Sequence, residues 1–355
     1  MSADVEPIDK LEGMILPLLN WYRDHARTLP WRSDCSAYRV WVSEIMLQQT
    51  RVAAVIGYFN RFMSALPDIS SLARVSEDEL LKLWQGLGYY NRARNLRRAA
   101  QVIVNDWHGE MPGDYESIRA LPGIGDYTAG AIGSIVFRLP VPAVDGNVLR
   151  VLTRVLGDTR DISAQSTKNY FRELLLQVIP REAPGEFNQS LMELGALICL
   201  PNGIPKCTIC PLHLQCAACL QNRTAELPRK AQKKQRRIEE RTVWLIFYDG
   251  CVALRRRPER GLLAGLWEYP NECGMDNALH DWGITASKQE SGLDGKHIFT
   301  HIEWQMHAII VNATSDDIPN GWVWASRSEL EQVYAVPNAF QSFTPVVKER
   351  LKYDL

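Results

Sequence analysis

The chain has 355 residues, of which 46% are hydrophobic and 23% charged, with a formal net charge of −1 at pH 7. This length allows two or three domains with sizeable cores, and the composition is that of folded soluble proteins. The near-zero charge excludes a globally basic protein, so any phosphate binding must come from local patches. Neither a signal peptide nor an apolar run of membrane-spanning length is visible, so we expect a soluble intracellular protein.

The first third of the chain shows helical periodicity interrupted by turns. In residues 38–51, apolar residues such as Val42, Ile45 and Met46 repeat at helical spacing, which predicts a helix with one buried face. Glu44 lies off this apolar stripe, on the same face as Gln48. A glutamate in such a position is usually solvated, so the spacing alone assigns it no role.

A glycine-rich break at residues 84–90 precedes a basic stretch. Leu87 stands between two glycines and is followed by Tyr89, which predicts a loop with an apolar side chain at its tip. Such a residue suits insertion into a base stack. An ordinary helix–helix turn with its tyrosines in the core is the alternative. Arg92 and Arg94 follow this break.

A tight turn at residues 121–125 separates two helical patterns. Gly123 and Gly125 allow the backbone to turn, and the amides of Ile124 and its successors would open the next helix, where unpaired donors bind phosphate. Further along, Asp145 follows an apolar run and precedes a glycine. An acidic residue close to such a turn is a candidate for catalysis, although a helix N-cap explains it equally well.

Five of the eight cysteines fall in one short segment. Four of them follow the pattern C-x7-C-x2-C-x5-C, which predicts a metal site in a reducing compartment. The spacing suits either one zinc ion or a [4Fe–4S] cluster. The four are Cys199, Cys207, Cys210 and Cys216, and Cys219 is left as a surplus thiol.

The pattern changes after a polar, basic stretch at residues 221–241, which we interpret as a linker and which contains Lys230, Lys233 and Lys234. From residue 242 the periodicity alternates, and Asp249-Gly250 predicts a two-residue hairpin turn. The remaining elements expected are strands at 299–311 and 322–324 and helices near 328–333 and near the end of the chain. Together they predict a small α+β domain.

Several of these stretches resemble one superfamily. Leu-Pro-Gly-Ile-Gly-Asp-Tyr-Thr-Ala-Gly, followed by Val-Asp-Gly-Asn-Val-Leu-Arg-Val, resembles the helix–hairpin–helix–Gly/Pro–Asp motif of base-excision DNA glycosylases. Trp-Val-Ser-Glu-Ile-Met-Leu-Gln-Gln-Thr is very similar to a segment of the MutY family of adenine DNA glycosylases. The resemblance implies that Gly123 and Gly125 form a phosphate-binding hairpin, that Glu44 protonates adenine, and that Asp145 assists cleavage of the glycosidic bond.

The same resemblance assigns further residues to the site. Tyr127 stands where related lyases such as endonuclease III carry a Schiff-base lysine, and a tyrosine has no amine for an imine. The tyrosine at this position therefore implies base removal without strand cleavage, and the resemblance implies that Tyr127 orients the two carboxyls. Trp31 and Arg32 are implied to line the adenine pocket, and Gln48 and Gln49 to enter the opened duplex. The resemblance also favours the interpretation in which the loop with Leu87 and Tyr89 inserts into the base stack.

The resemblance extends through the second half of the chain. The family surrounds a [4Fe–4S] cluster with C-x6-C-x2-C-x5-C, so this chain carries one extra residue between its first two cysteines. The C-terminal part resembles the Nudix-like domain of the MutY family but lacks the magnesium-binding Nudix box, so we expect no diphosphatase activity. Phe299, Thr300 and His301 stand where the family reads 8-oxoguanine with Phe-Ser-His. A buried strand start with His301 capping a turn is the alternative.

We therefore expect a mainly α-helical helix–hairpin–helix glycosylase domain with a [4Fe–4S] loop, joined to an α+β Nudix-like domain. The expected boundaries are 1–198, 199–220, 221–241 for the linker, and 242–355. The expected enzyme is a monomeric, cytoplasmic (nucleoid-associated if bacterial), monofunctional adenine DNA glycosylase, which acts on duplex DNA with A:8-oxoguanine or A:G and does not contact membranes. Tyr127 disfavours a bifunctional glycosylase/lyase, and the presence of both Glu44 and Asp145 disfavours a non-catalytic lesion-binding protein.

Overall fold

The computed structural model describes residues 6–231, 235–274 and 278–351. These residues divide into two compact units. The helical unit contains residues 6–74 and 95–231, and the sheet unit contains residues 75–94 together with the described residues from 235 onward. Lys233 and Lys234 of the predicted basic linker lie outside the described residues.

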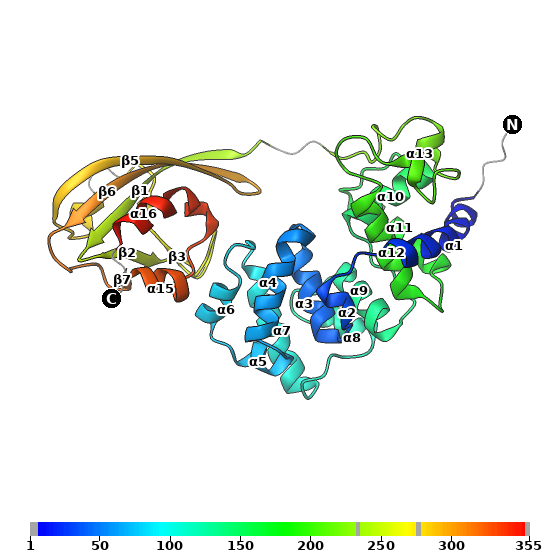
Figure 1. Ribbon diagram of the computed structural model, residues 1–355, viewed down its shortest axis with the longest axis horizontal. Coiled ribbons are helices and arrows are strands. Elements are labelled where there is room, and N and C mark those ends of the chain that lie inside the picture. Colours follow the sequence, from blue (N-terminus) through cyan, green and yellow to red (C-terminus); the bar gives the residue numbers. More distant parts are fainter. Residues whose placement is uncertain (1–5, 232–234, 275–277, 352–355) are drawn as a thin grey trace. The chain divides into compact units, whose positions relative to one another are not determined.

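The helical unit is built from short and medium-length helices (Figure 1). Helix α7 (Asn91–Asp106) begins in the sheet unit and continues in the helical unit. The others in the helical unit are α1 (Pro7–His25), α2 (Pro30–Ser33), α3 (Ala37–Leu47), α4 (Val52–Ala65), α5 (Ile69–Arg74), α8 (Tyr115–Ala120), α9 (Asp126–Phe137), α10 (Gly146–Leu156), α11 (Gln165–Val178), α12 (Pro184–Leu197), the 3-10 turn η1 (Cys207–Ile209) and α13 (Ala217–Leu220).

Helix α10 contributes to a hydrophobic core of this unit. Its residues Val148 and Leu152 are fully buried, together with Leu11 of α1, Phe171 of α11 and Leu191 of α12. Figure 1 shows α10, α11 and α12 lying together. Each fully buried aliphatic or aromatic side chain contributes about 1.5–3 kcal/mol, so α10 is held firmly along its length. The helix therefore gives a rigid support to whatever lies at its two ends.

Helix α9 is rich in small residues, and this composition lets another part of the chain approach closely. A Cβ atom on Gly130 would lie 2.2 Å from the carbonyl oxygen of Pro142, a distance that no side chain tolerates. The segment that leads from Pro142 into α10 therefore packs directly on α9. Asp145 is carried by this segment, so the small residues of α9 help to fix its position.

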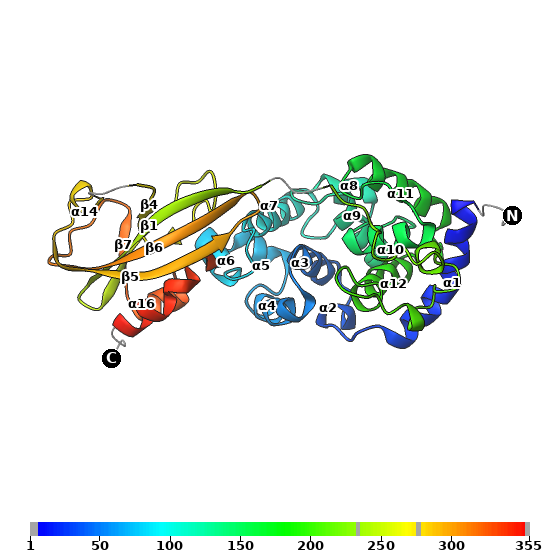
Figure 2. The same ribbon diagram turned by 90° about the horizontal axis from the view of Figure 1, so that it is seen from above.

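The sheet unit contains a seven-stranded sheet with the order β3-β2-β1-β6-β5, in which β4 pairs with β1 and β7 with β2. Strands β1 and β6 run parallel, and β5 and β6 antiparallel, as seen side by side in Figure 2. The strands are β1 (Arg237–Tyr248), β2 (Cys251–Arg256), β3 (Trp267–Glu268), β4 (Asn271–Glu272), β5 (Ala286–Ile298), β6 (Ile302–Ala313) and β7 (Trp322–Ala325). The helical segments are α6 (Glu77–Leu83), α14 (Ala278–Asp281), α15 (Arg327–Gln332), η2 (Asn338–Phe343) and α16 (Thr344–Arg350).

The predicted hairpin is confirmed. Tyr248 pairs with Cys251 across a two-residue turn, and Asp249 and Gly250 both have positive φ, 40° and 79°. That combination is the turn type whose twist matches antiparallel strands. The predicted strand at 322–324 and the helix near 328–333 are confirmed as β7 and α15.

Two predictions in this unit are wrong in part. Residues 299–301 form the turn between β5 and β6, so the strand predicted from Phe299 begins at Ile302. Strand β5 is polar and glycine-containing and gave no alternating signal. Strand β1 begins at Arg237, inside the stretch predicted as linker, because this residue pairs with Ile302 in the long parallel ladder to β6. Among the described residues, no helix is long and apolar enough to cross a membrane.

Candidate active site

Glu44 is buried in the interior of the helical unit, with 6% of its surface exposed. Its helix, α3, packs on α4 and also on α9, so the face away from the apolar stripe is covered as well. Tyr127, in the first turn of α9, donates a hydrogen bond from Oη to Glu44 Oε2 at 2.5 Å. The solvated alternative for Glu44 is therefore wrong, because a second helix covers the face that the periodicity left to solvent.

Burial raises the pKa of Glu44 to about 7. The hydrogen bond from Tyr127 and the charge of Arg32 lower this pKa, whereas the nearby Asp145 carboxylate raises it. Burial also raises the pKa of Tyr127 well above its ordinary value, with the Glu44 and Asp145 charges adding to the effect. At neutral pH a substantial fraction of Glu44 is therefore protonated, as a general acid requires.

Asp145 is the N-cap of α10. Its Oδ1 accepts hydrogen bonds from the backbone amides of Asn147 and Val148, each at 2.8 Å, and its Oδ2 accepts one from Asn147 Nδ2 at 2.8 Å. Burial raises the pKa of Asp145, and these hydrogen bonds oppose the rise. The capping interpretation is thus correct and compatible with catalysis, because the cap holds the carboxylate in one orientation.

The two carboxyls face the same cavity. Glu44, Tyr127 and Asp145 line it together with Trp31 and Arg32, which come from α2. A second groove shares the same three residues and is also lined by Gln48, Gln49 and Gly125. The basic side chains of Lys168, Arg172 and Lys230 line it too. The structure therefore brings together most of the residues that the sequence assigned to the helical unit.

The hairpin differs in detail from the prediction. Gly123 has a φ of 77°, as the turn requires, but the amide of Ile124 donates to Leu121 O at 3.1 Å and is used within the turn. The first intrahelical bond of α9 runs from Ala129 N to Gly125 O at 2.9 Å. The amides of residues 126–128 therefore have no intrahelical acceptor. Any phosphate bound here would meet these amides instead of that of Ile124.

Sequence reasoning missed Glu193, a fully buried glutamate on α12. It accepts hydrogen bonds from Arg27 Nε at 2.7 Å, Arg27 Nη2 at 2.8 Å and Arg32 Nη2 at 3.0 Å. Burial alone would raise the pKa of Glu193, but these arginines outweigh it and lower the pKa to about 2. The ion pair fixes Arg32 in the cavity wall. The only signal was a charge inside the apolar run Leu191–Leu194.

In the sheet unit, Thr300 and His301 are exposed at the β5–β6 turn. The alternative of a buried strand start is therefore wrong. Phe299 anchors the turn, because its ring packs 4.9 Å from that of Trp304 in the core of the unit. The hydroxyls of Thr300 and Tyr89 lie 3.4 Å apart, within hydrogen-bonding distance.

The turn at residues 84–90 belongs to the same unit. Gln85 Nε2 donates to Val336 O at 2.6 Å. Tyr89 is 52% exposed, whereas Leu87 is buried at 6%. Arg92 donates to the carbonyl oxygen of Leu87 at 3.0 Å, so this guanidinium braces the turn from inside. The exposed side chain at this turn is therefore Tyr89, and insertion by Leu87 would require it to leave its buried position.

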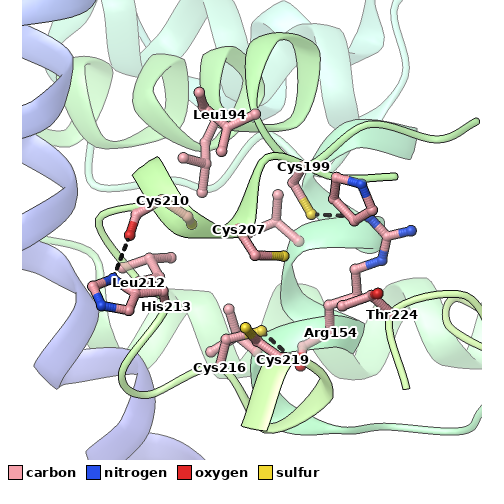
Figure 3. A pocket seen from close by; sticks show the side chains of 14 residues that line it. Arg154, Leu194, Cys199, Cys207, Cys210, Leu212, His213, Cys216, Cys219 and Thr224 are labelled. Carbon is pink, nitrogen blue, oxygen red and sulfur yellow. Dashed lines mark hydrogen bonds between the residues drawn. The ribbon is translucent and has the colours of Figure 1, made fainter. Parts of the chain in front are cut away.

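The cysteine segment encloses a cavity of its own (Figure 3). Arg154 of α10 donates from Nη1 to Cys199 Sγ at 3.2 Å, and the Cys216 thiol donates to the carbonyl oxygen of Arg154 at 3.3 Å. Burial raises the pKa of Cys207 to about 11 and that of Cys210 to about 12. The cysteines that line the cavity are Cys199, Cys207, Cys210, Cys216 and Cys219.

The donor set of this cavity fits a cluster. Cysteine sulfur is the ligand that iron–sulfur clusters take. A cubane cluster uses one thiolate at each of four corners, so its ligands surround a space, as the cysteines surround this cavity. The guanidinium of Arg154 suits the negative charge of such thiolates.

Helix α10 connects this cavity to Asp145. Arg150, buried on α10, donates from Nε to Cys199 O at 2.7 Å and from Nη2 to Asn147 Oδ1 at 2.8 Å. Asn147 in turn donates to Asp145. The cysteine segment and the N-terminus of α10 are thus tied by one buried arginine.

Buried Glu44 and half-buried Asp145 share one cavity near the helix–hairpin–helix turn, and the family comparison identifies the class as base-excision DNA glycosylases. Residues 42–177 match the HhH-GPD superfamily of base excision DNA repair proteins, and residues 242–344 match the NUDIX domain. A solved thermostable thymine-DNA glycosylase is 27% identical, with a TM-score of 0.54, over 60% of this chain and 98% of that one. A solved endonuclease III–DNA complex, 23% identical with a TM-score of 0.52, shares the fold over 62% of this chain and 99% of that one.

Adenine DNA glycosylases match nearly the full chain. The Mus musculus protein is 35% identical over 88% of this chain and 73% of its own length. The Homo sapiens protein is 38% identical over 93% of this chain and 72% of its own length. The chain belongs to the adenine DNA glycosylase family.

Proposed function

We propose that this protein hydrolyses the N-glycosidic bond of adenine paired with 8-oxoguanine or guanine in duplex DNA, without cleaving the strand. The observation that carries the proposal is the placement of Glu44 and Asp145 in one cavity, with Tyr127 bonded to Glu44. The two carboxyls have different surroundings, which suits one of them to act as a protonated acid and the other as a negative charge that stabilises a cation.

The proposed chemistry begins with protonated Glu44, which donates its proton to N7 of an adenine extruded from the duplex. The glycosidic bond then breaks, its electron pair leaves with the neutral base, and an oxocarbenium-like sugar remains. Ionised Asp145 stabilises that cation until water adds, as in glycoside hydrolysis. The hydrogen bonds that hold Asp145 keep its carboxylate in place during this charge development.

The groove beside this cavity is the proposed path of the DNA strand. Lys168, Arg172 and Lys230 line it and suit phosphate oxygens. Gln48 and Gln49 line the same groove as these cations and the carboxyls, where an opened base pair would expose the partner base. Tyrosine at position 127 offers no amine to the sugar, which supports base release without a lyase step.

Recognition of the partner base is proposed for the sheet unit. Exposed Tyr89 and the exposed Thr300–His301 turn lie together there, joined by the two hydroxyls. The threonine hydroxyl preserves a hydrogen-bonding group for the edge of 8-oxoguanine. In the described conformation we assign the stacking role to Tyr89, which is exposed, whereas Leu87 is buried.

We further propose that Cys199, Cys207, Cys210 and Cys216 hold a [4Fe–4S] cluster that organises their segment. The domain boundaries 1–198, 199–220, 221–241 and 242–355 remain part of the proposal, with β1 starting inside the linker. We also propose that the protein is a monomer and that it acts in the cytoplasm, in association with the nucleoid if the cell is bacterial.

The test is a single-turnover assay that scores free adenine and strand nicks separately. Duplexes carry A:8-oxoguanine, A:G, A:T or oxidised thymine. We expect adenine release fastest from the first, none from A:T, and nicks only after alkali. Glu44→Gln and Asp145→Asn should each lower the rate by at least about 10²-fold with little change in DNA affinity.

Other outcomes would refute parts of the proposal. Prompt nicking at oxidised thymine would place the enzyme among bifunctional lyases. Tight binding with no base release would indicate a lesion-binding protein. Equal rates on A:8-oxoguanine and A:G, unaltered in Thr300→Ala, would remove the role of the β5–β6 turn and leave the carboxyl pair in place.

A further inference from the structure

The cavity of the cysteine segment contains more thiols than a cubane cluster needs. A [4Fe–4S] cluster takes four cysteine ligands. Five cysteines line this cavity, and the surplus one is Cys219. It lies on the short helix α13, three residues after Cys216, so the two side chains project from the same face. Figure 3 shows Cys207, Cys216 and Cys219 around the same space.

Cys219 lies near one particular member of the set. It is close enough to Cys207 to raise the pKa of the Cys207 thiol, and both side chains line the same cavity. The position of Cys219 is defined by its helix, because α13 packs on α10 and the Cys219 carbonyl accepts from Asn222 N at 3.1 Å. The surplus sulfur is thus held beside a proposed ligand.

The four proposed ligands are not held equally. Cys199 accepts from Arg154, and Cys216 is buried at the start of α13, which packs on α10. Cys207 instead follows the lengthened loop 200–206, whose Ile204 is 90% exposed. A longer, solvated loop restrains its end less than a buried helix does. Cys207 is therefore the proposed ligand whose backbone follows an exposed loop, and Cys219 lies near it in the same cavity.

We propose that Cys219 is a reserve ligand of the iron–sulfur cluster, which replaces Cys207 when that thiolate leaves its iron. The inference rests on the proposed cluster. In the exchange, the Cys219 thiol releases its proton to solvent as its sulfur binds iron, and the departing Cys207 sulfur takes a proton from solvent. Neither iron nor sulfur changes oxidation state.

The test measures iron and sulfide per chain and the decay of the cluster absorbance in air, on the full-length protein purified anaerobically. Cys207→Ser should retain most of its iron, and Cys207→Ser/Cys219→Ser should lose it. Cys219→Ser alone should contain the full amount but lose it on the order of tenfold faster than the parent chain, as for loss of a partner next to a metal ligand. Cys251→Ser, on β2, is the matched control and should behave as the parent.

Two results would overturn the inference. One is a Cys207→Ser protein that lacks iron to the same extent as the double variant. The other is a Cys219→Ser cluster that decays at the parental rate, and this comparison decides the matter even where Cys207→Ser does not fold. A parent chain that contains zinc or no iron would refute the cluster itself, which is a different failure.

Discussion

Replacing Glu44 with glutamine tests the electrostatics of the cavity without DNA. Burial raises the pKa of Glu44 from 4.5 to about 7 in the folded chain, and unfolding returns the carboxyl to water. Because the folded pKa lies above the unfolded one, the stabilising contribution of Glu44 is fully present below pH 4.5 and is lost as the pH rises through about 7. Glutamine has nearly the same shape and stays neutral throughout.

The size of the effect follows from the same two values. The gap between 4.5 and about 7, at about 1.36 kcal/mol per pH unit, corresponds to about 3 kcal/mol. We therefore compare the free energies of unfolding of the Glu44→Gln variant and the parent. Between pH 4.5 and pH 8 the difference between them should shift by about 3 kcal/mol in favour of the variant. Most of this gain falls between pH 5 and 7, where only the unfolded carboxyl is fully ionised.

Urea denaturation followed by the helical circular-dichroism signal, at several pH values and constant ionic strength, measures this difference. Glu182→Gln, at an exposed turn of the same unit, is the control for the removal of a surface carboxylate. A Glu44→Gln curve parallel to that of the parent across this range would show that Glu44 is ionised in the folded protein. The general-acid assignment would then lose its physical basis.

Three further variants test the surrounding contacts. Tyr127→Phe removes the hydrogen bond that lowers the pKa of Glu44, so the alkaline limb of the single-turnover pH–rate profile should move to higher pH; a move to lower pH would contradict this. Glu193→Gln should lower the free energy of unfolding at pH 7 by up to about 3 kcal/mol, and this loss should disappear as the pH falls through 4.5 towards about 2. Urea denaturation at pH 7 and near pH 2 measures the difference. Arg150→Ala leaves buried acceptors unpaired and should cost about 1–3 kcal/mol, seen as a lower thermal midpoint, whereas an unchanged midpoint would show that water replaces the guanidinium.

Features that depend on near neighbours in the chain could be predicted from the sequence. The hairpin at Asp249-Gly250 follows from two residues that tolerate positive φ. The capping position of Asp145 follows from an acidic residue before a helical pattern. The grouping of the cysteines follows from their spacing, because short loops between ligands leave few ways to arrange them.

Strand β5 escaped prediction because its polar, glycine-containing sequence has no alternating pattern, and it is held by pairing with β6. The start of β6 was misplaced for the same reason, since residues 299–301 become a turn only once β5 exists. The hairpin amide of Ile124 was misassigned because a local bond to Leu121 competes with helix opening.

The sequence alone determined which residue types are present at the site, the order of the motifs, and the helices and turns that carry them. Only the tertiary structure decided that Glu44 is buried and protonatable, that Glu193 holds Arg32, and that Cys219 enters the cysteine cavity. The reason is that burial, pKa and side-chain contacts arise from segments far apart in the chain. The pKa of Glu44 is set by Tyr127, Asp145 and the packing of α3 on α9, none of which leaves a trace in the residues around position 44.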